Sequence, residues 1–264
     1  MKVFMGTDLE GVAGVVTFTQ QTYDDTKYYE QSKKLLTAEV NAAVEGMVEA
    51  GINDILVSDS HGPGGMDYET LMPPARVIHG RPGAPRETVR KVKQNYDVCM
   101  IIGQHAMAGV KEGNLHHTQN SRQVESYTLN GEPIGEIAQF ALYHGALGMP
   151  MIFLSGDDAA CREAKELIPG ITAVAVKQGL SRNSAISLAA PEARKRIREG
   201  VKEAVEKQEK DPLKPLVWEG PFVLDKTFFY TDTADRAAEA PDAERVDERT
   251  VRFKSDSIED IIYR

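Results

Sequence analysis

The sequence has few cysteines, a deficit of positive charge and no long apolar run, and each shortage argues against a class of protein. Cys99 and Cys161 are the only 2 cysteines among 264 residues. Each lies in an apolar segment, which indicates small core residues rather than a disulfide framework. The formal net charge is −9, and no segment combines many Lys and Arg residues with aromatic ones. Nucleic acid and anionic membrane surfaces are therefore not expected as partners.

No segment approaches the ~20 consecutive apolar residues that a membrane-spanning helix needs. No signal peptide can be drawn either, because only Lys2 precedes the first apolar run and Asp8 interrupts that run early. A cytoplasmic enzyme is therefore expected. With 41% apolar and 27% charged residues, the chain can bury a sizeable core as one large domain or two compact ones.

Strand-like and helix-like segments alternate along the chain, which is typical of an α/β fold. The segment Asp97–Gly103 is apolar throughout after its first residue, as expected for a strand covered on both faces. The pair Asn130-Gly131 is a strong type I′ turn signal, so Ser121–Ile134 is expected to be a hairpin. We predict three layers, α/β/α, around a largely parallel central sheet, with a smaller subdomain that contains the hairpin.

The remaining elements follow from apolar periodicity and from Gly and Pro punctuation. Further strands are expected at Lys2–Thr7, Asp54–Asp59, Arg76–His79, Met151–Ser155, Ile171–Val176, Pro221–Phe228 and Arg249–Phe253. Helices are expected at about Lys27–Ala50, Glu87–Gln94, Gly135–Leu147, Asp157–Leu167, Pro191–Lys207, Ala234–Ala240 and Ile258–Tyr263.

Two carboxylates, Asp8 and Glu10, stand where the first strand gives way to Gly11 and Gly14. In an extended backbone the side chains at i and i+2 point to the same face, so both acids are expected to project toward one place. Two ionised carboxylates held so close together need a cation. This segment therefore says more about function than any other.

Two histidines occupy equivalent positions after other predicted strands. His61 lies just past the second strand, and His105 just past the strand Asp97–Gly103. Residues that follow parallel strands gather along one edge of the sheet, where ligands normally bind. These two histidines should therefore converge with the two acids, and Glu136, at the start of a predicted helix, supplies a fifth group.

This set of three carboxylates and two imidazoles, without a thiolate, suits Zn²⁺, Mn²⁺ or Co²⁺. Five protein ligands exceed what one catalytic zinc takes, because a catalytic site keeps a position open for water. Two metals that share Asp8 as a bridge, roughly 3.5–4 Å apart, satisfy both demands.

Each of these carboxylates also has a simpler interpretation, since a single carboxylate at a strand end is more often a helix cap or turn former than a metal ligand. Asp157 and Asp158 are interpreted in that way, as an N-cap and a first-turn acid. His116 and His117 lie in a loop suited to an acid or base, and the residues alone do not rank them.

Two functions other than a dinuclear metalloenzyme are compatible with parts of the pattern. Asp8, Ser58, Lys177 and Asp157-Asp158 could imitate a haloacid-dehalogenase-like, Mg²⁺-dependent phosphatase, but that scheme leaves both histidines and Glu136 without a role. A non-catalytic metal-binding protein is the second of these functions. Turnover of a dipeptide, measured together with the metal content, separates these two functions from that of a dinuclear metalloenzyme.

Seven segments, in order, resemble the zinc-dependent D-aminopeptidases of the DppA type, peptidase family M55. They are MGTDLEGVAGV from Met5, SDSHG from Ser58, IIGQHAMAG from Ile101, GNLHHT from Gly113, NGEPIGE from Asn130, SGDDAACREA from Ser155 and VKQGLSR from Val176. The resemblance spans almost the whole chain, which makes it much more specific than any single motif. It implies one M55-type unit over residues 1–264, made of two intertwined subdomains.

The resemblance also implies a role for each site residue. Asp8, Glu10 and His61 would hold one zinc, and Asp8, His105 and Glu136 the second. The family's G-x-x-x-H-[ST] segment matches Gly113 through Thr118, which makes His117 rather than His116 the catalytic histidine. Short D-amino-acid peptides such as D-Ala-D-Ala are the implied substrates. Ring-like homo-oligomers, with a decamer as the candidate size, are the implied assembly.

Overall fold

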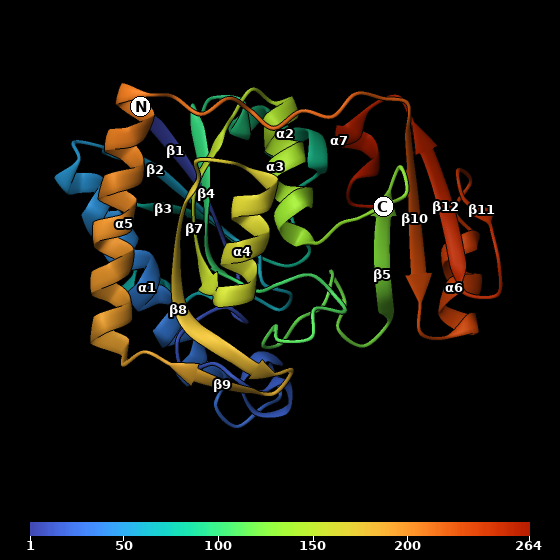
Figure 1. Ribbon diagram of the computed structural model, residues 1–264, viewed down its shortest axis with the longest axis horizontal. Coiled ribbons are helices and arrows are strands. Elements are labelled where there is room, and N and C mark those ends of the chain that lie inside the picture. Colours follow the sequence, from blue (N-terminus) through green and yellow to red (C-terminus); the bar gives the residue numbers. More distant parts are fainter.

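A computed structural model describes all residues from 1 to 264, and its central feature is a seven-stranded sheet (Figure 1). The strands are β1 (Lys2–Thr7), β2 (Asp54–Asp59), β3 (Arg76–Ile78), β4 (Val98–Gln104), β7 (Met151–Asp157), β8 (Thr172–Ser181) and β9 (Ser184–Ser187). They lie in the order β3-β2-β1-β4-β7-β8-β9. Every neighbouring pair is parallel except β8 and β9, so the predicted, largely parallel sheet is confirmed.

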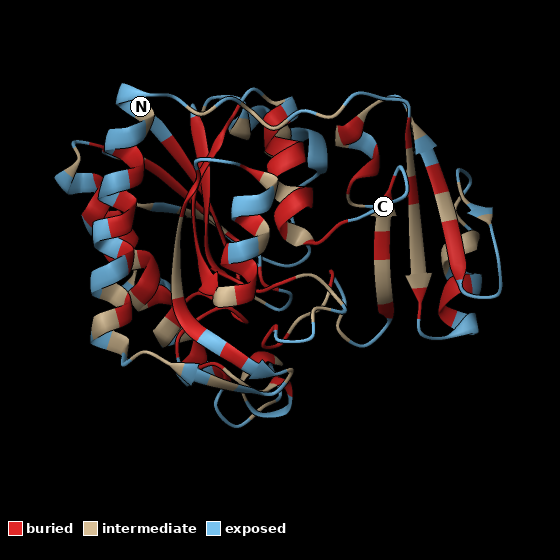
Figure 2. Cartoon of the chain, in the orientation of Figure 1, coloured by how far each residue is buried: buried red, intermediate tan, exposed pale blue.

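Helices cover both faces of this sheet and complete the three predicted layers (Figure 1). One face packs against α1 (Tyr29–Glu49) and α5 (Ala190–Lys210), and the other against α3 (Glu136–Ala146) and α4 (Asp158–Leu167). On the same side as α3, the last residue of α2 (Arg86–Lys93) contacts Phe4 of β1. Successive residues of β1 point to opposite faces: Met5 packs in the α1 layer, whereas Phe4 packs in the α3 layer. The central strands are consequently buried along most of their length (Figure 2).

A second, antiparallel sheet of five strands stands beside the helical layer (Figure 1). It contains, in order, β11 (Glu244–Arg245), β12 (Thr250–Ser255), β10 (Phe222–Phe228), β5 (Val124–Leu129) and β6 (Glu132–Pro133). The predicted hairpin is confirmed as β5 and β6, and Asn130 and Gly131 have the positive φ angles, 52° and 87°, of a type I′ turn. The C-terminal part of the chain returns to pair with this hairpin.

Helix α3 joins the two sheets. Its residues Ile137 and Ala141 belong to the core cluster of the central sheet, whereas Ala138 and Leu142 belong to the cluster of the second sheet. The short helices α6 (Thr231–Ala238) and α7 (Ile258–Ile261) pack on the second sheet, and α7 also contacts α3. Glu136 begins α3 and therefore lies where the two sheets meet.

The prediction was incomplete around β8, which was expected to end at Val176 but continues to Ser181 and turns back as β9. This hairpin is stabilised by loops that are distant in sequence. The amide of Leu115 donates to the Arg182 carbonyl at 2.7 Å, and the amide of Gly14 donates to Ser187 Oγ at 3.1 Å. Two short helices, η1 (Phe18–Thr22) and η2 (Tyr68–Thr70), were also not predicted. None of the helices has the length and apolar character needed to cross a membrane.

Candidate metal centre

The segment that carries Asp8 and Glu10 continues beside β4 after β1 ends. The amide of Asp8 donates to the Ile102 carbonyl at 2.9 Å, and the amide of Gly11 donates to the Gly103 carbonyl at 2.7 Å. A Cβ atom at position 11 would lie 2.1 Å from the Gln104 carbonyl oxygen, so only glycine fits there. This close approach keeps both acids at the carboxyl end of β4.

The two predicted histidines lie at the same edge of the sheet. Because β1, β2 and β4 are parallel neighbours, the residues that follow them come together. His61 Nδ1 lies 3.2 Å from Asp8 Oδ1 and 3.1 Å from Glu10 Oε2. His105 Nε2 lies 3.1 Å from Asp8 Oδ2 and 3.5 Å from Glu136 Oε1. All five predicted ligand residues are therefore in one cluster, with a different histidine on each oxygen of Asp8.

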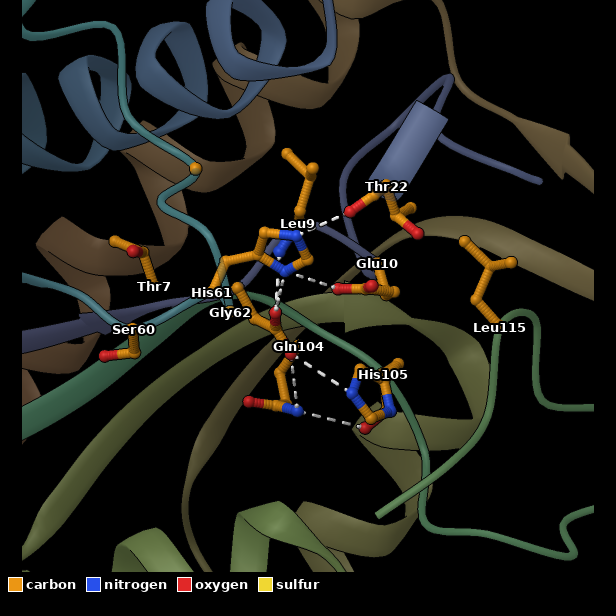
Figure 3. A network of polar contacts seen from close by, with 12 residues as sticks. Thr7, Leu9, Glu10, Thr22, Ser60, His61, Gly62, Gln104, His105 and Leu115 are labelled. Atoms are coloured by element: carbon orange, nitrogen blue, oxygen red, sulfur yellow. Dashed lines mark hydrogen bonds and ion pairs between the residues drawn. The ribbon is translucent and has the colours of Figure 1, made fainter. Parts of the chain in front are cut away.

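Hydrogen bonds orient both imidazole rings for metal binding. The Nε2 atom of His61 donates to the Thr22 carbonyl at 2.8 Å, and Nδ1 of His105 donates to the Ala106 carbonyl at 2.9 Å. A carbonyl can only accept, so each ring keeps its other nitrogen directed at the carboxylates. In Figure 3 the His61 ring lies between Thr22 and Glu10 and makes these contacts. Histidine ligands of metals are commonly held by such an outer hydrogen bond.

The donor set fits a divalent cation. Asp8, Glu10, His61 and His105 are all buried. Glu10 Oε2 lies 3.1 Å from His61 Nδ1, and His105 Nε2 lies 3.1 Å from Asp8 Oδ2, but neither Glu10 Oε2 nor His105 Nε2 has a partner in hydrogen-bond geometry. The ligand atoms of Asp8, Glu10 and His105 lie within 4.8 Å of one another, as do those of His105, His117 and Glu136. Buried polar atoms that lack partners are costly unless something else satisfies them. A metal held by oxygen and nitrogen ligands would satisfy these.

The charges of the cluster act on one another strongly. Burial alone lowers the pKa of both His61 and His105, but the neighbouring carboxylates outweigh it and hold each pKa well above its usual value. Burial alone raises the pKa of Asp8, yet the two histidines keep that pKa well below its usual value. The cluster thus favours positive charge among its carboxylates, as a cation site does.

His117 joins the cluster, whereas His116 turns away from it. The His117 ring stacks on His105 with centroids 4.0 Å apart, and its Nε2 lies 3.8 Å from Glu136 Oε1. Its Nδ1 atom donates to the Leu115 carbonyl at 2.9 Å. His116 instead accepts a hydrogen bond from the Gly109 amide through Nδ1 at 3.1 Å. The residues alone left these two histidines unranked, and the fold separates them.

Two residues that sequence reasoning did not place here support the ligands. Gln104 Nε2 donates to Asp8 Oδ2 at 3.3 Å. Lys177 is buried, and its Nζ donates to the carbonyls of Glu10 and Val15. These two hydrogen bonds hold the segment from Glu10 to Val15, which we call the ligand loop, against β8. A lysine directly after the apolar run Ala173–Val176 was the available signal, because a buried charge needs a specific partner.

The phosphatase interpretation finds no support in this arrangement. Lys177 is used on main-chain carbonyls, and Asp157 is the N-cap of α4, as predicted, accepting from the Ala160 amide at 2.7 Å. Ser58 lines a cavity that Asp8 and His61 also line, and its hydroxyl accepts a hydrogen bond from Ser60 at 3.3 Å.

Known proteins resemble this chain over nearly its whole length. The model of the peptidase M55 family, described as D-aminopeptidase, matches residues 1–263. A D-aminopeptidase of Bacillus subtilis (strain 168) is 31% identical over 259 residues, which cover 97% of this chain and 92% of that protein. The solved structure of the Zn-dependent D-aminopeptidase DppA from Bacillus subtilis, described as a self-compartmentalizing protease, superposes with a TM-score of 0.89 at 29% identity. That match covers 100% of this chain and 94% of the other. The chain belongs to the M55 family of peptidases.

Proposed function

We propose that the protein is a zinc-dependent aminopeptidase that removes the N-terminal residue from short peptides, D-amino-acid peptides such as D-Ala-D-Ala in particular. The observation that carries the proposal is the convergence of five metal-type ligands in one cluster, beside a cavity that His117 also lines, in a chain of the M55 family. The preference for D-residues rests on the names of the two relatives.

The ligand geometry favours two metals. Asp8, Glu10 and His61 would hold one zinc, and Asp8, His105 and Glu136 the other. The bridging role of Asp8 is supported by its two oxygens, each of which faces a different histidine. Mn²⁺ and Co²⁺ suit the same nitrogen and oxygen donors.

When bound, zinc supplies Lewis acidity, which polarises a carbonyl oxygen and lowers the pKa of water. The protein's own residues would carry out the proton transfers. His117 donates its Nδ1 proton to the Leu115 carbonyl, which leaves Nε2 free to accept a proton from the attacking water. The same atom can then return that proton to the departing amine. The free amine of a peptide could be held by one of the cluster's carboxylates or by a bound metal, which would direct cleavage to the N-terminal residue.

We also propose that the chain forms one unit over residues 1–264 with two intertwined subdomains, and that copies assemble into a ring-like homo-oligomer, with a decamer as the candidate size. The two sheets, joined through α3, are the basis for the subdomains. The self-compartmentalizing relative supports the assembly.

The decisive experiment combines metal analysis with hydrolysis of D-Ala-D-Ala and of L-Ala-L-Ala by the purified protein. We expect close to two divalent ions per chain, faster cleavage of the D-dipeptide, loss of activity on chelation and recovery on addition of Zn²⁺. Full activity in the metal-free protein would disprove the proposal. Tight metal binding without any peptide hydrolysis would instead select the non-catalytic alternative.

A further inference from the structure

Three of the proposed metal ligands, Asp8, His61 and Glu136, line one part of a cavity that extends along the central sheet. The cavity has a volume of about 330 Å³, and Asp8, His117 and Glu136 contribute to its wall. Phe4 and Lys93 line the same cavity. Phe4 lies in β1, and Asp8 directly follows this strand, four positions later, so these two residues mark places about 13 Å apart along the extended chain.

Lys93 is a cation without an anionic partner in this cavity. It is the last residue of α2, and no carboxylate forms an ion pair with it. Its Nζ lies over two aromatic rings, 4.8 Å from the centroid of Phe4 and 4.7 Å from that of Tyr143. Burial lowers the pKa of Lys93 to about 8, so the side chain is still mostly protonated at neutral pH.

Such an ammonium group is only partly stabilised by its surroundings. Cation–π contacts favour the charge by about 0.5–2 kcal/mol, but they supply no hydrogen-bond acceptor. A partly buried charge that lacks an acceptor is costly. At the far end of a substrate cavity, an anionic group of the ligand can supply the hydrogen-bond acceptor that the protein does not give to Lys93.

The separation between the metal ligands and Phe4 indicates which anionic group of a substrate would lie near Lys93. An extended peptide spans about 3.3–3.6 Å per residue, so a peptide of two or three residues is about 7–11 Å long. With its N-terminus at the metal ligands, its C-terminus would lie toward the Phe4 side of the cavity. We propose that Lys93 binds the C-terminal carboxylate of the substrate and restricts hydrolysis to dipeptides and tripeptides with a free C-terminus. This inference rests on the proposed aminopeptidase function and names its substrate class.

The test compares D-Ala-D-Ala with its C-terminal amide, which differs only in the charge that Lys93 would recognise. For the wild type we expect kcat/KM to be about 10- to 100-fold higher for the acid, mainly through KM, as befits a hydrogen bond to a charged group. In Lys93→Met this preference should nearly vanish through a higher KM for the acid, with the amide unchanged. Lys93→Arg should restore part of it.

Lys91→Met is the matched control, because Lys91 lies on the same helix with its side chain 72% exposed and pairs only with Glu87. It should keep the full preference. Equal hydrolysis of acid and amide by the wild type, or an equal loss for both substrates in Lys93→Met, would overturn the proposal, the latter because it indicates a structural role. If the Lys93→Met protein does not fold, equal hydrolysis of acid and amide by the wild type still overturns the proposal, and Lys93→Arg still tests it through a partial loss of the preference.

Failure of the proposed function would look different, since the zinc-loaded wild type would then hydrolyse neither compound. In that case calorimetric titration with the same two compounds still tests Lys93. Binding of the acid that exceeds binding of the amide, and that is lost in Lys93→Met, supports the carboxylate site. Equal binding of the two compounds by the wild type refutes it.

Discussion

Asp8 makes contacts that no other side chain of the cluster could replace. Its two carboxylate oxygens face different histidines, His61 at 3.2 Å and His105 at 3.1 Å, while Gln104 also donates to it. Glu10 and Glu136 each approach only one of these histidines. A single side chain thus connects the two halves of the proposed site.

Asp8→Ala should therefore be more damaging than the loss of any other ligand. We expect the metal content to fall close to zero and turnover to fall with it, whereas Glu10→Ala should mainly weaken one of the two proposed ions. Metal analysis beside a dipeptide assay measures both effects. Asp54→Ala, at an exposed ion pair with Arg76, is a suitable control for removing an aspartate. Normal metal content in Asp8→Ala would rule out the bridging role.

His117→Ala should separate catalysis from metal binding. Because the five ligands stay in place, we expect normal metal content but turnover about 10²- to 10⁴-fold lower, the usual effect of losing a positioned acid or base. His116→Ala should stay close to the wild type, since its ring contacts the Gly109 amide rather than the cluster. Similar losses in the two variants would point to loop disruption and remove the basis for a catalytic His117.

At the scale of elements, two buried charges hold the loop that carries Asp8 and Glu10. Lys177 on β8 donates to carbonyls at both ends of the ligand loop. Glu39 on α1 accepts from the Ala13 amide at 3.0 Å through one oxygen, while its other oxygen has no partner. Burial raises the pKa of Glu39 to about 7, against the opposing effects of the Ala13 amide and Lys177. The loop is therefore positioned at a cost in stability.

The raised pKa of Glu39 predicts a specific pH dependence. A carboxyl whose pKa is higher in the folded state stabilises the fold below its unfolded pKa, near 4.3, and that stabilisation is lost as the pH rises through about 7. Glu39→Gln cannot titrate, so it should gain stability relative to the wild type between pH 5 and pH 8, by about 1–3 kcal/mol. Denaturant unfolding of both proteins at the two pH values measures this. A constant difference between them would contradict the assignment.

At the scale of the whole molecule, the proposed site links parts of the chain that are distant in sequence. Residues after β1, β2 and β4 meet the first residue of α3, and α3 in turn packs on both sheets. A bound ion would therefore hold together the two regions that we propose as subdomains.

Metal removal should accordingly lower the thermal stability of the entire chain. An ion that binds only the folded state, at a concentration 100 times its Kd, adds about 2.7 kcal/mol of stability. For a chain of this size we expect chelation to lower Tm by roughly 5–10 °C, with recovery when Zn²⁺ is restored. Differential scanning calorimetry with and without a chelator checks this. An identical Tm in both states would show that the proposed ions do not hold the fold together.

The sequence by itself determined the α/β class, the hairpin at Asn130-Gly131 and the gathering of Asp8, His61 and His105 at one edge of the sheet. These features depend on local patterns: periodicity, turn chemistry, and the rule that parallel strands end at the same edge. The M55 motifs were readable for the same reason, because each is a short continuous segment.

Only the tertiary structure decided which of two adjacent histidines faces the cluster, that β8 extends into a hairpin, and that Lys93 and Lys177 point where they do. Each depends on partners far along the chain: Lys177 meets Glu10 across 167 positions. The direction of a side chain is set by the packing around it, and that packing exists only after distant segments have come together.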